Sequence, residues 1–380
     1  MSKFKVAIFT GNYNHIRDGV SLTLNRLVAF LLNNNAEVLV FGPTVEKPAL
    51  EHAGTLVPVP STKLPGRPEY RFSRSFPKSV REKLINFGPD IVHIATPDLL
   101  GFRALKWAKK NQKPVVASYH THFSSYLKYY RLSLLEPLLW KYLKWFYKNC
   151  RHVYVPSPSM AEFLEENGIE TDIRIWARGI ELDLFNPSRR DDTWREKQGF
   201  RENDIVISFI SRLVWEKNLK LYADVINRLQ EKYPQIRALV VGDGPAGEGL
   251  RKMLPKAVFT GFLTGDELAK AYACSDIFFF PSDTETFGNV TLEAMASGLP
   301  CVVADATGSR SLVEHGENGF IVPVERSDKF YKFIEQLIIN EAKRSGMALK
   351  SLEKARSYSW DTINNKLLKY YTEVLEAKSQ

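Results

Sequence analysis

The sequence predicts an α/β protein made of two doubly wound domains, each with a parallel sheet covered on both faces. Three observations favour this fold class. The 380 residues exceed what one hydrophobic core usually serves. Short apolar runs alternate with helical patterns, first in the N-terminal half and again in the C-terminal half. A polar stretch at 186–204, with Pro187, Gly199 and clustered charges, separates the two series.

The first series begins with an apolar run at 5–9, which is followed by a turn-rich stretch and a helical pattern from Leu22 to Leu32. The apolar run at 36–43 completes a strand-helix-strand unit. Further strand-like runs follow at 91–94, 115–118 and 152–155. We predict an N-terminal acceptor-binding domain over residues 1–186 and a linker over 187–204.

The second series has the same alternation and predicts a nucleotide-binding domain over residues 205–357. Its strand-like runs lie at 205–210, 238–241, 258–260, 277–280 and 301–304. The last segment, 358–380, is amphipathic, and we expect a helix there that crosses back to the N-terminal domain. Two facing domains of this kind leave a cleft, where ligands bind at the carboxyl ends of the strands.

Composition narrows the class of protein. The chain has 44% hydrophobic and 25% charged residues, a composition typical of globular proteins. No apolar run reaches the roughly eighteen residues of a spanning helix, and the N-terminal run is too short for a signal peptide, so we expect a cytoplasmic protein. The three cysteines, Cys150, Cys274 and Cys301, are far apart and predict neither a disulfide framework nor a zinc site.

The net charge of +9 lies entirely in the first half of the chain. Residues 1–188 hold 25 basic and 16 acidic side chains, whereas the rest holds 27 of each. Residues 101–151 alone carry eleven basic side chains and one acid, Glu136. Such asymmetry indicates an anionic partner, either a membrane or a nucleic acid.

The strongest motif runs from Asp283 to Pro300, directly after the apolar strand at 277–280. A strand, a turn containing Gly288 and a helix would follow one another, so that the backbone N–H groups of Gly288, Asn289 and Val290 face outward and can hold a phosphate. Glu285 lies in the turn and Glu293 about two helical turns later, where carboxylates can accept hydrogen bonds from sugar and ribose hydroxyls. The structural alternative is that Glu285 favours the helix dipole and Glu293 is merely solvated.

A second motif, 211–218, follows the apolar strand at 205–210. Its Arg212 and Lys217 lie five residues apart in a loop between strand and helix, where both can converge on one diphosphate without a metal ion. The alternative is a solvated basic pair.

These two motifs resemble the donor site of retaining glycosyltransferases of family 4, which have the GT-B fold of two facing Rossmann-like domains. The resemblance covers nearly the whole chain. It implies that Glu285 binds the donor sugar, that Glu293 binds the ribose, and that Arg212 and Lys217 neutralise the departing diphosphate. Ser211 stands where the family usually has glycine.

Shorter segments of the chain also match the family, in the same order along the sequence. His120 matches the histidine that faces the donor sugar, and His122 stands where relatives often carry an acid and is expected to meet the acceptor. Gly19 falls in the family's glycine-rich loop, of which one glycine is absent. The remaining expected donor contacts are Phe262, Leu263 and Phe287. No cofactor and no metal are implied, since the nucleotide sugar is itself the substrate.

A competing pattern, G-x-G-x-x-G, begins at Gly242 and Gly244 and is typical of dinucleotide-binding proteins. Such units normally end their next strand in an acid that binds the ribose, and the strand at 257–262 has none. We interpret Gly242 and Gly244 as a tight turn near the donor base. An NAD-dependent oxidoreductase remains the alternative enzyme.

The basic region predicts an amphipathic helix over residues 133–151. Lys141, Lys144, Lys148 and Arg151 would share one face, flanked by Trp140, Trp145 and Tyr147 and opposite an apolar face that includes Leu138. This arrangement suits a peripheral protein on anionic lipid, and Lys128 and Arg131 extend the same region. The alternative is an ordinary core-packed helix with a solvated lysine face. No nucleic-acid motif accompanies the charge.

This region also resembles the glycolipid-forming branch of the family, which includes sulfoquinovosyl, mannosyl and ceramide glycosyltransferases. The sequence therefore predicts a retaining transferase that moves a hexose or uronic acid from a nucleotide sugar to a membrane lipid such as ceramide or diacylglycerol. A UDP-sugar is favoured as donor, with GDP-mannose as the other candidate, and the protein is expected on the inner face of the cytoplasmic membrane. Two alternatives remain: transfer to a soluble or polysaccharide acceptor, and a non-catalytic regulator that binds nucleotide sugars. The sequence does not predict the oligomeric state.

Overall fold

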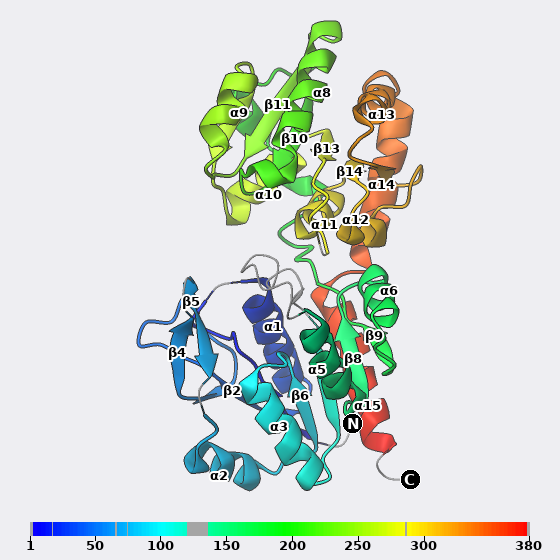
Figure 1. Ribbon diagram of the computed structural model, residues 1–380. Helices are drawn as coiled ribbons and strands as arrows, with labels where there is room; N and C mark the ends of the chain where they lie inside the picture. Colours follow the sequence, from blue (N-terminus) through cyan, green and yellow to red (C-terminus); the bar gives the residue numbers. More distant parts are fainter. Residues whose placement is uncertain are drawn as a thin grey trace. The chain divides into compact units, whose positions relative to one another are not determined.

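The computed structural model describes residues 3–16, 18–64, 67–73, 75–119, 136–285 and 287–377 (Figure 1). The chain divides into two compact units. The first unit consists of Met1–Ala177 together with Trp360–Gln380, and the second of Arg178–Ser359. Each unit is an α/β fold around a parallel sheet, which confirms the predicted fold class.

The first unit has a seven-stranded sheet in the order β3-β2-β1-β6-β7-β8-β9, with every adjacent pair parallel. The strands are β1 (Lys5–Phe9), β2 (Glu37–Gly42), β3 (Thr55–Pro58), β6 (Ile91–Ile94), β7 (Val115–Ser118), β8 (His152–Val155) and β9 (Ile173–Ile175). An antiparallel pair, β4 (Ser61–Leu64) and β5 (Arg67–Ser73), was not predicted from the sequence. The helices are α1 (Gly19–Asn33), α2 (Lys78–Phe87), α3 (Leu99–Lys110), α5 (Glu136–Lys148), α6 (Pro158–Glu166) and α15 (Trp360–Glu376).

The second unit has a six-stranded parallel sheet in the order β12-β11-β10-β13-β14-β15. Its strands are β10 (Ile205–Ile210), β11 (Ile236–Val241), β12 (Val258–Gly261), β13 (Ile277–Phe280), β14 (Cys301–Ala304) and β15 (Gly319–Val322). Its α-helices are α7 (Asp192–Lys197), α8 (Leu219–Lys232), α9 (Gly247–Met253), α10 (Gly265–Ala273), α11 (Asn289–Ala296), α12 (Thr307–Leu312), α13 (Ser327–Ile339) and α14 (Glu341–Arg356). Two 3₁₀ turns are η2 (Pro187–Arg189) and η3 (Trp215–Lys217).

The central strands of both sheets are buried on both faces, and that explains their near-continuous apolar sequences. All four residues of β6, β7, β8, β13 and β14 are buried. In each sheet the strand order reverses at the first strand of the unit, since β1 lies between β2 and β6 and β10 lies between β11 and β13. A ligand crevice is expected outside the carboxyl ends of the strands at such a reversal.

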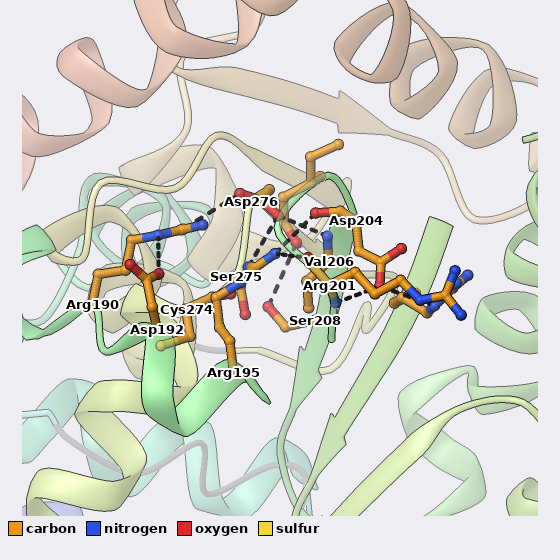
Figure 2. Close-up of polar contacts among 12 residues, drawn as sticks. Arg190, Asp192, Arg195, Arg201, Asp204, Val206, Ser208, Cys274, Ser275 and Asp276 are labelled. Atoms are coloured by element: carbon orange, nitrogen blue, oxygen red, sulfur yellow. Dashed lines mark hydrogen bonds and ion pairs between the residues drawn. The ribbon is translucent and has the colours of Figure 1, made fainter. Parts of the chain in front are cut away.

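The structure draws the boundary between the units after Ala177, not after 186, and the segment predicted as a linker belongs to the second unit. Figure 2 shows the reason, which is the buried guanidinium of Arg195 in α7. It donates to the carbonyl oxygens of Cys274 at 2.5 Å and Asp204 at 2.9 Å and lies 3.5 Å from the Asp276 carboxylate. A charged side chain is buried only with such partners, so this polar-looking segment is packed structure.

The C-terminal helix α15 lies in the first unit, where it is bonded to the sheet. The Tyr371 hydroxyl is 2.6 Å from Nδ1 of His93, whose Nε2 is 2.5 Å from Oγ of Ser118. All three side chains are buried. Burial lowers the pKa of His93 to about 3, so the ring is neutral and donates at one nitrogen while accepting at the other. His93 is therefore a structural residue.

Candidate active site

The predicted donor residues gather on loops at the carboxyl edge of the second sheet. Because β10 lies between β11 and β13, the segments that follow these three strands are neighbours. A pocket of about 390 Å³ opens among them. Six predicted residues line it: Arg212, Gly242, Phe262, Leu263, Val290 and Glu293. Five residues that were not predicted complete the lining: Ile210, Ser211, Val241, Asp243 and Leu268.

Gly242 and Gly244 let the loop after β11 pack against the loop after β10. Gly242 has φ +128°, and a Cβ there would lie 2.0 Å from the Ser211 carbonyl oxygen. A Cβ on Gly244 would lie 2.3 Å from the carbonyl oxygen of Leu213. In a dinucleotide fingerprint this space admits the pyrophosphate. Here the neighbouring backbone fills it, and the glycines form the tight turn beside the pocket.

Glu293 on α11 presents a carboxyl group to the pocket from a largely buried position. Its Oε2 accepts a hydrogen bond from the Tyr272 hydroxyl at 2.8 Å. Burial raises the pKa of Glu293 to about 7, and the Tyr272 hydrogen bond opposes the rise. A carboxyl group at this pKa is partly protonated near neutrality, so a ligand that donates hydrogen bonds to it favours the ionised form.

We therefore expect nucleotide affinity to depend on the ionisation of Glu293. If ribose hydroxyls donate to its carboxylate, lowering the pH from 8 to 6 removes most of the ionised form and weakens binding by about tenfold. Titration calorimetry with GDP or UDP measures this effect. Because the nucleotide phosphates also titrate, Glu293→Gln is the control. A variant with the same pH profile as the wild type would contradict the role of Glu293.

The N-terminus of α11 is open, whereas that of α1 is closed. Gly288, at φ +89°, precedes α11, and no side chain in the described part of the chain caps this helix. The first amide in helical hydrogen bonding is that of Leu292, which bonds to the Gly288 carbonyl. The preceding amides of Asn289 and Val290 are placed to meet an anion. Phe287, before them, is buried, so it anchors the turn and does not line the pocket.

Gly19 begins α1, where a carboxylate already takes the place that a phosphate would use. Asp18 Oδ1 accepts from the amides of Val20 at 3.0 Å and Ser21 at 2.8 Å. The Ser21 hydroxyl completes this cap by accepting from the Asp18 amide at 2.9 Å. The geometry therefore offers little for a phosphate contact at Gly19.

Lys217 and Glu285 form an ion pair between the loops after β10 and β13. Their side chains are only 14% and 17% exposed. The Lys217 ammonium also donates to Thr284 Oγ1 at 3.1 Å. Beside it, the Asn218 amide donates to the Pro281 carbonyl at 2.9 Å and so ties the two loops together. The pair thus presents one cation and one carboxylate at a fixed position beside the open helix N-terminus.

Arg212 differs from Lys217 because its side chain is 70% exposed. Its guanidinium lies 3.4 Å from the Glu216 carboxylate, an exposed pair that contributes little to stability. Arg212 is therefore free to turn toward a ligand in the pocket that it lines.

Besides the five unpredicted lining residues named above, which include Asp243, Tyr272 and Asn218 were also missed from the sequence. Tyr272 lies 21 residues from Glu293, and no local pattern connects them. Asp243 stands between the two glycines, and its carboxylate accepts from the Phe262 amide at 2.9 Å. Its place within the glycine motif was the signal available for it. Asn218 follows Lys217 and has a left-handed backbone at φ +56°.

Helix α5 carries the predicted basic face with three corrections, the first of which is that the helix ends at Lys148 and does not include Arg151. Lys141, Lys144 and Lys148 are exposed, as is Trp145. Leu138, predicted on the apolar side, is 65% exposed on the same side as the lysines, and Tyr147, predicted beside the lysines, is fully buried. The helix turns Leu143, Phe146 and Tyr147 to the core, and this stripe is narrower than the apolar pattern predicted. Trp140 is half-buried and packs on Phe163 at 5.7 Å.

Four predicted site residues, His120, His122, Lys128 and Arg131, lie outside the described residues. In the part of the chain that is described, no helix is long and apolar enough to cross a membrane. The same residues include no group of three or more side chains that could hold a metal ion.

Two family models match the chain in succession. Glycosyltransferase Family 4 matches residues 17–184 and Glycosyl transferases group 1 matches residues 190–354. The GDP-mannose-dependent alpha-mannosyltransferase of Corynebacterium glutamicum is 30% identical over 98% of this chain and 89% of its own length. The sulfoquinovosyl transferase SQD2 of Arabidopsis thaliana is 34% identical over 77% of this chain and 58% of its own length. The alpha-monoglucosyldiacylglycerol synthase of Streptococcus pneumoniae is 26% identical over 78% of this chain and 70% of its own length.

Solved structures agree on the fold. The sucrose-phosphate synthase of Thermosynechococcus elongatus has a TM-score of 0.76 at 19% identity, covering 98% of this chain and 100% of that one. WaaG, a glycosyltransferase involved in lipopolysaccharide biosynthesis, has a TM-score of 0.65 at 16% identity, covering 95% and 98%. With its two Rossmann-like sheets, its family matches and its full-length relatives, the chain belongs to glycosyltransferase family 4 and is a glycosyltransferase of the GT-B fold.

Proposed function

We propose that this glycosyltransferase moves a hexose from a nucleoside diphosphate sugar to a membrane lipid, with retention at the anomeric carbon and without a metal ion. The observation that supports this most is the arrangement at one sheet edge. A pocket with Glu293, the open N-terminus of α11 and the Lys217–Glu285 pair follow adjacent strands. These features suit the ribose, the diphosphate and the sugar of one donor molecule.

In the proposed reaction the acceptor hydroxyl forms a bond to the anomeric carbon while the bond from that carbon to the diphosphate oxygen breaks. Negative charge develops on the departing diphosphate, and Arg212, Lys217 and the amides of Asn289 and Val290 stabilise it. The hydroxyl proton leaves with the diphosphate. Glu285 orients the sugar by accepting hydrogen bonds from its hydroxyls. Attack on the same face as the leaving group gives retention, as the family resemblance implies.

GDP-mannose is the first donor to test. A relative named for this donor is 30% identical over 98% of the chain, whereas the neighbour HepE, solved with UDP-glucose, is 21% identical and shows a shared fold only. The pocket of about 390 Å³ leaves both bases as candidates, and UDP-sugars belong in the same screen.

A lipid acceptor is supported by two relatives and by helix α5. The relatives from Streptococcus pneumoniae and Acholeplasma laidlawii are both named alpha-monoglucosyldiacylglycerol synthase. On α5, Leu138 and Trp145 are exposed beside Lys141, Lys144 and Lys148. Apolar and aromatic side chains among lysines are typical of a surface that lies on anionic lipid, where each basic residue contributes about 1 kcal/mol. We propose a peripheral location on the cytoplasmic face of the membrane.

Mass spectrometry of lipid products tests the proposal. The purified protein is given GDP-mannose or a UDP-hexose together with diacylglycerol or ceramide in neutral or anionic vesicles. We expect a hexosyl lipid from one donor, formed faster on anionic vesicles and about 10²-fold more slowly by Glu285→Gln. Transfer only to soluble saccharides would contradict the lipid acceptor. Binding of nucleotide sugars without hydrolysis or transfer would contradict the proposed reaction.

A further inference from the structure

Two adjoining pockets lie at the amino-terminal edge of the first sheet, away from the strand ends that face a Rossmann-type ligand. They have volumes of about 450 and 700 Å³ and share Lys148, Cys150 and Arg151. The segments that form them end α3 and α5 and lead into β7 and β8. Nothing in the proposed donor site involves this edge.

Positive charge dominates these pockets. Five cations line them: Lys109, Lys113, Lys144, Lys148 and Arg151. None of the five forms an ion pair within the described residues. The carboxylates present are Glu170 and Asp172. Asp172 is already paired with Arg174 at 2.7 Å and with His152 at 3.5 Å, so it does not neutralise the lysines.

Helix dipoles explain only part of this cluster. Lys109 and Lys148 lie in the last turns of α3 and α5, where a cation stabilises a helix. Lys113, Lys144 and Arg151 do not lie in the last turn of either helix, so the helix dipole does not explain them. The carbonyl groups at the helix ends are also already bonded, since the Lys113 amide donates to Ala108 at 2.9 Å and the Cys150 amide to Tyr147 at 2.9 Å. The cations are therefore not needed to satisfy them.

The backbone makes room for one of the cations. A Cβ on Gly168 would lie 2.7 Å from Nζ of Lys144, so this ammonium rests directly over the glycine at the rim of the larger pocket. Trp145, 41% exposed, forms part of the same wall. The pockets thus offer ammonium and guanidinium donors beside an indole ring, a combination suited to a phosphate carried on an organic group.

We infer that these paired pockets form a binding site for a phosphate group, separate from the donor site. Arg151 would hold the phosphate as a fork while Lys144 and Lys148 act as point charges. The phosphate group can belong to an anionic lipid headgroup or to a soluble phosphoester. The inference goes beyond the proposed function and does not depend on it, because the site lies in the first unit and its occupancy is measured without sugar transfer.

The indole N–H resonance of Trp145, assigned with Trp145→Phe, reports binding at this site alone. The probes are inorganic phosphate and monomeric dihexanoyl phosphatidic acid. We expect a saturable shift that needs at least about tenfold more probe in Lys148→Gln/Arg151→Gln. Lys110→Gln is the matched control, because Lys110 is exposed at the end of α3 but lines neither pocket. It should titrate like the wild type.

Tighter binding of phosphatidic acid than of phosphate would assign the site to a lipid headgroup, and equal binding would assign it to a soluble phosphate group. A Trp145 resonance that does not saturate with either probe would overturn the inference, as would equal losses in Lys110→Gln and the double variant. If the double variant unfolds, Lys144→Gln tests the same site. GDP binding in the second unit is measured in parallel, so failure of the donor assignment is seen separately.

Discussion

Lys217→Ala is expected to lower kcat for sugar transfer by about 10²- to 10³-fold, the usual cost of removing one preorganised group that stabilises a developing anion. The Lys217 ammonium is held between Glu285 and Thr284, and its side chain is only 14% exposed. No cation from solvent can take its place with the same geometry. Release of nucleoside diphosphate from the donor, with saturating acceptor, measures kcat.

Lys220→Ala is the matched control for this prediction. Lys220 lies three residues further on, at the start of α8, and is exposed with its ammonium 5.7 Å from the Trp215 ring. Its removal should leave kcat at the wild-type level. A folded Lys217→Ala protein, shown by circular dichroism, that turns over like the wild type would contradict the role of Lys217.

Glu285→Gln is expected to separate transfer from nucleotide binding. We expect kcat to fall by about 10²-fold, because the amide is a weaker acceptor for the sugar hydroxyls than the carboxylate. The affinity for GDP or UDP should stay the same or increase. In the ligand-free protein Lys217 is paired with Glu285, and the variant frees this cation for the diphosphate. Single-turnover rates and calorimetry measure the two effects.

Glu216→Gln is the control for this second prediction. Its carboxylate is 61% exposed beside Arg212 in the same loop, so it should change neither kcat nor nucleotide affinity by much. If Glu285→Gln weakened transfer and nucleotide binding in parallel, Glu285 would be needed to build the pocket and not to orient the sugar.

The fold could be predicted because buried parallel strands have a simple pattern. The strands β10 and β13 appear in the sequence as unbroken apolar runs that end at a loop. The unit boundary could not be predicted in the same way. The polar residues near Arg195 have the composition of a linker. The hydrogen bonds from the buried guanidinium to two carbonyl groups, which show that the segment is packed, exist only in the folded chain. The β4–β5 hairpin was missed because β4 is only four residues long, carries no apolar run and is part-exposed.

The candidate site was predictable where function depends on neighbours in sequence. The turn at Gly288 and the helix after it follow from adjacent residues, and together they form the uncapped helix N-terminus that we propose as the anion site. Pairings across the sheet are different. Lys217 meets Glu285 from 68 residues away, and Tyr272 meets Glu293 from 21 residues away. Such contacts depend on strand order, which no local pattern encodes.

We propose above all that the carboxyl edge of the second sheet binds a nucleoside diphosphate. Titration calorimetry of the full chain with GDP, UDP and NAD tests it most directly. We predict that GDP or UDP binds at one site per chain, that NAD does not bind, and that Glu293→Ala weakens nucleotide binding by at least about tenfold. Binding of NAD as tight as that of GDP and UDP, or undiminished nucleotide binding by Glu293→Ala, would contradict it.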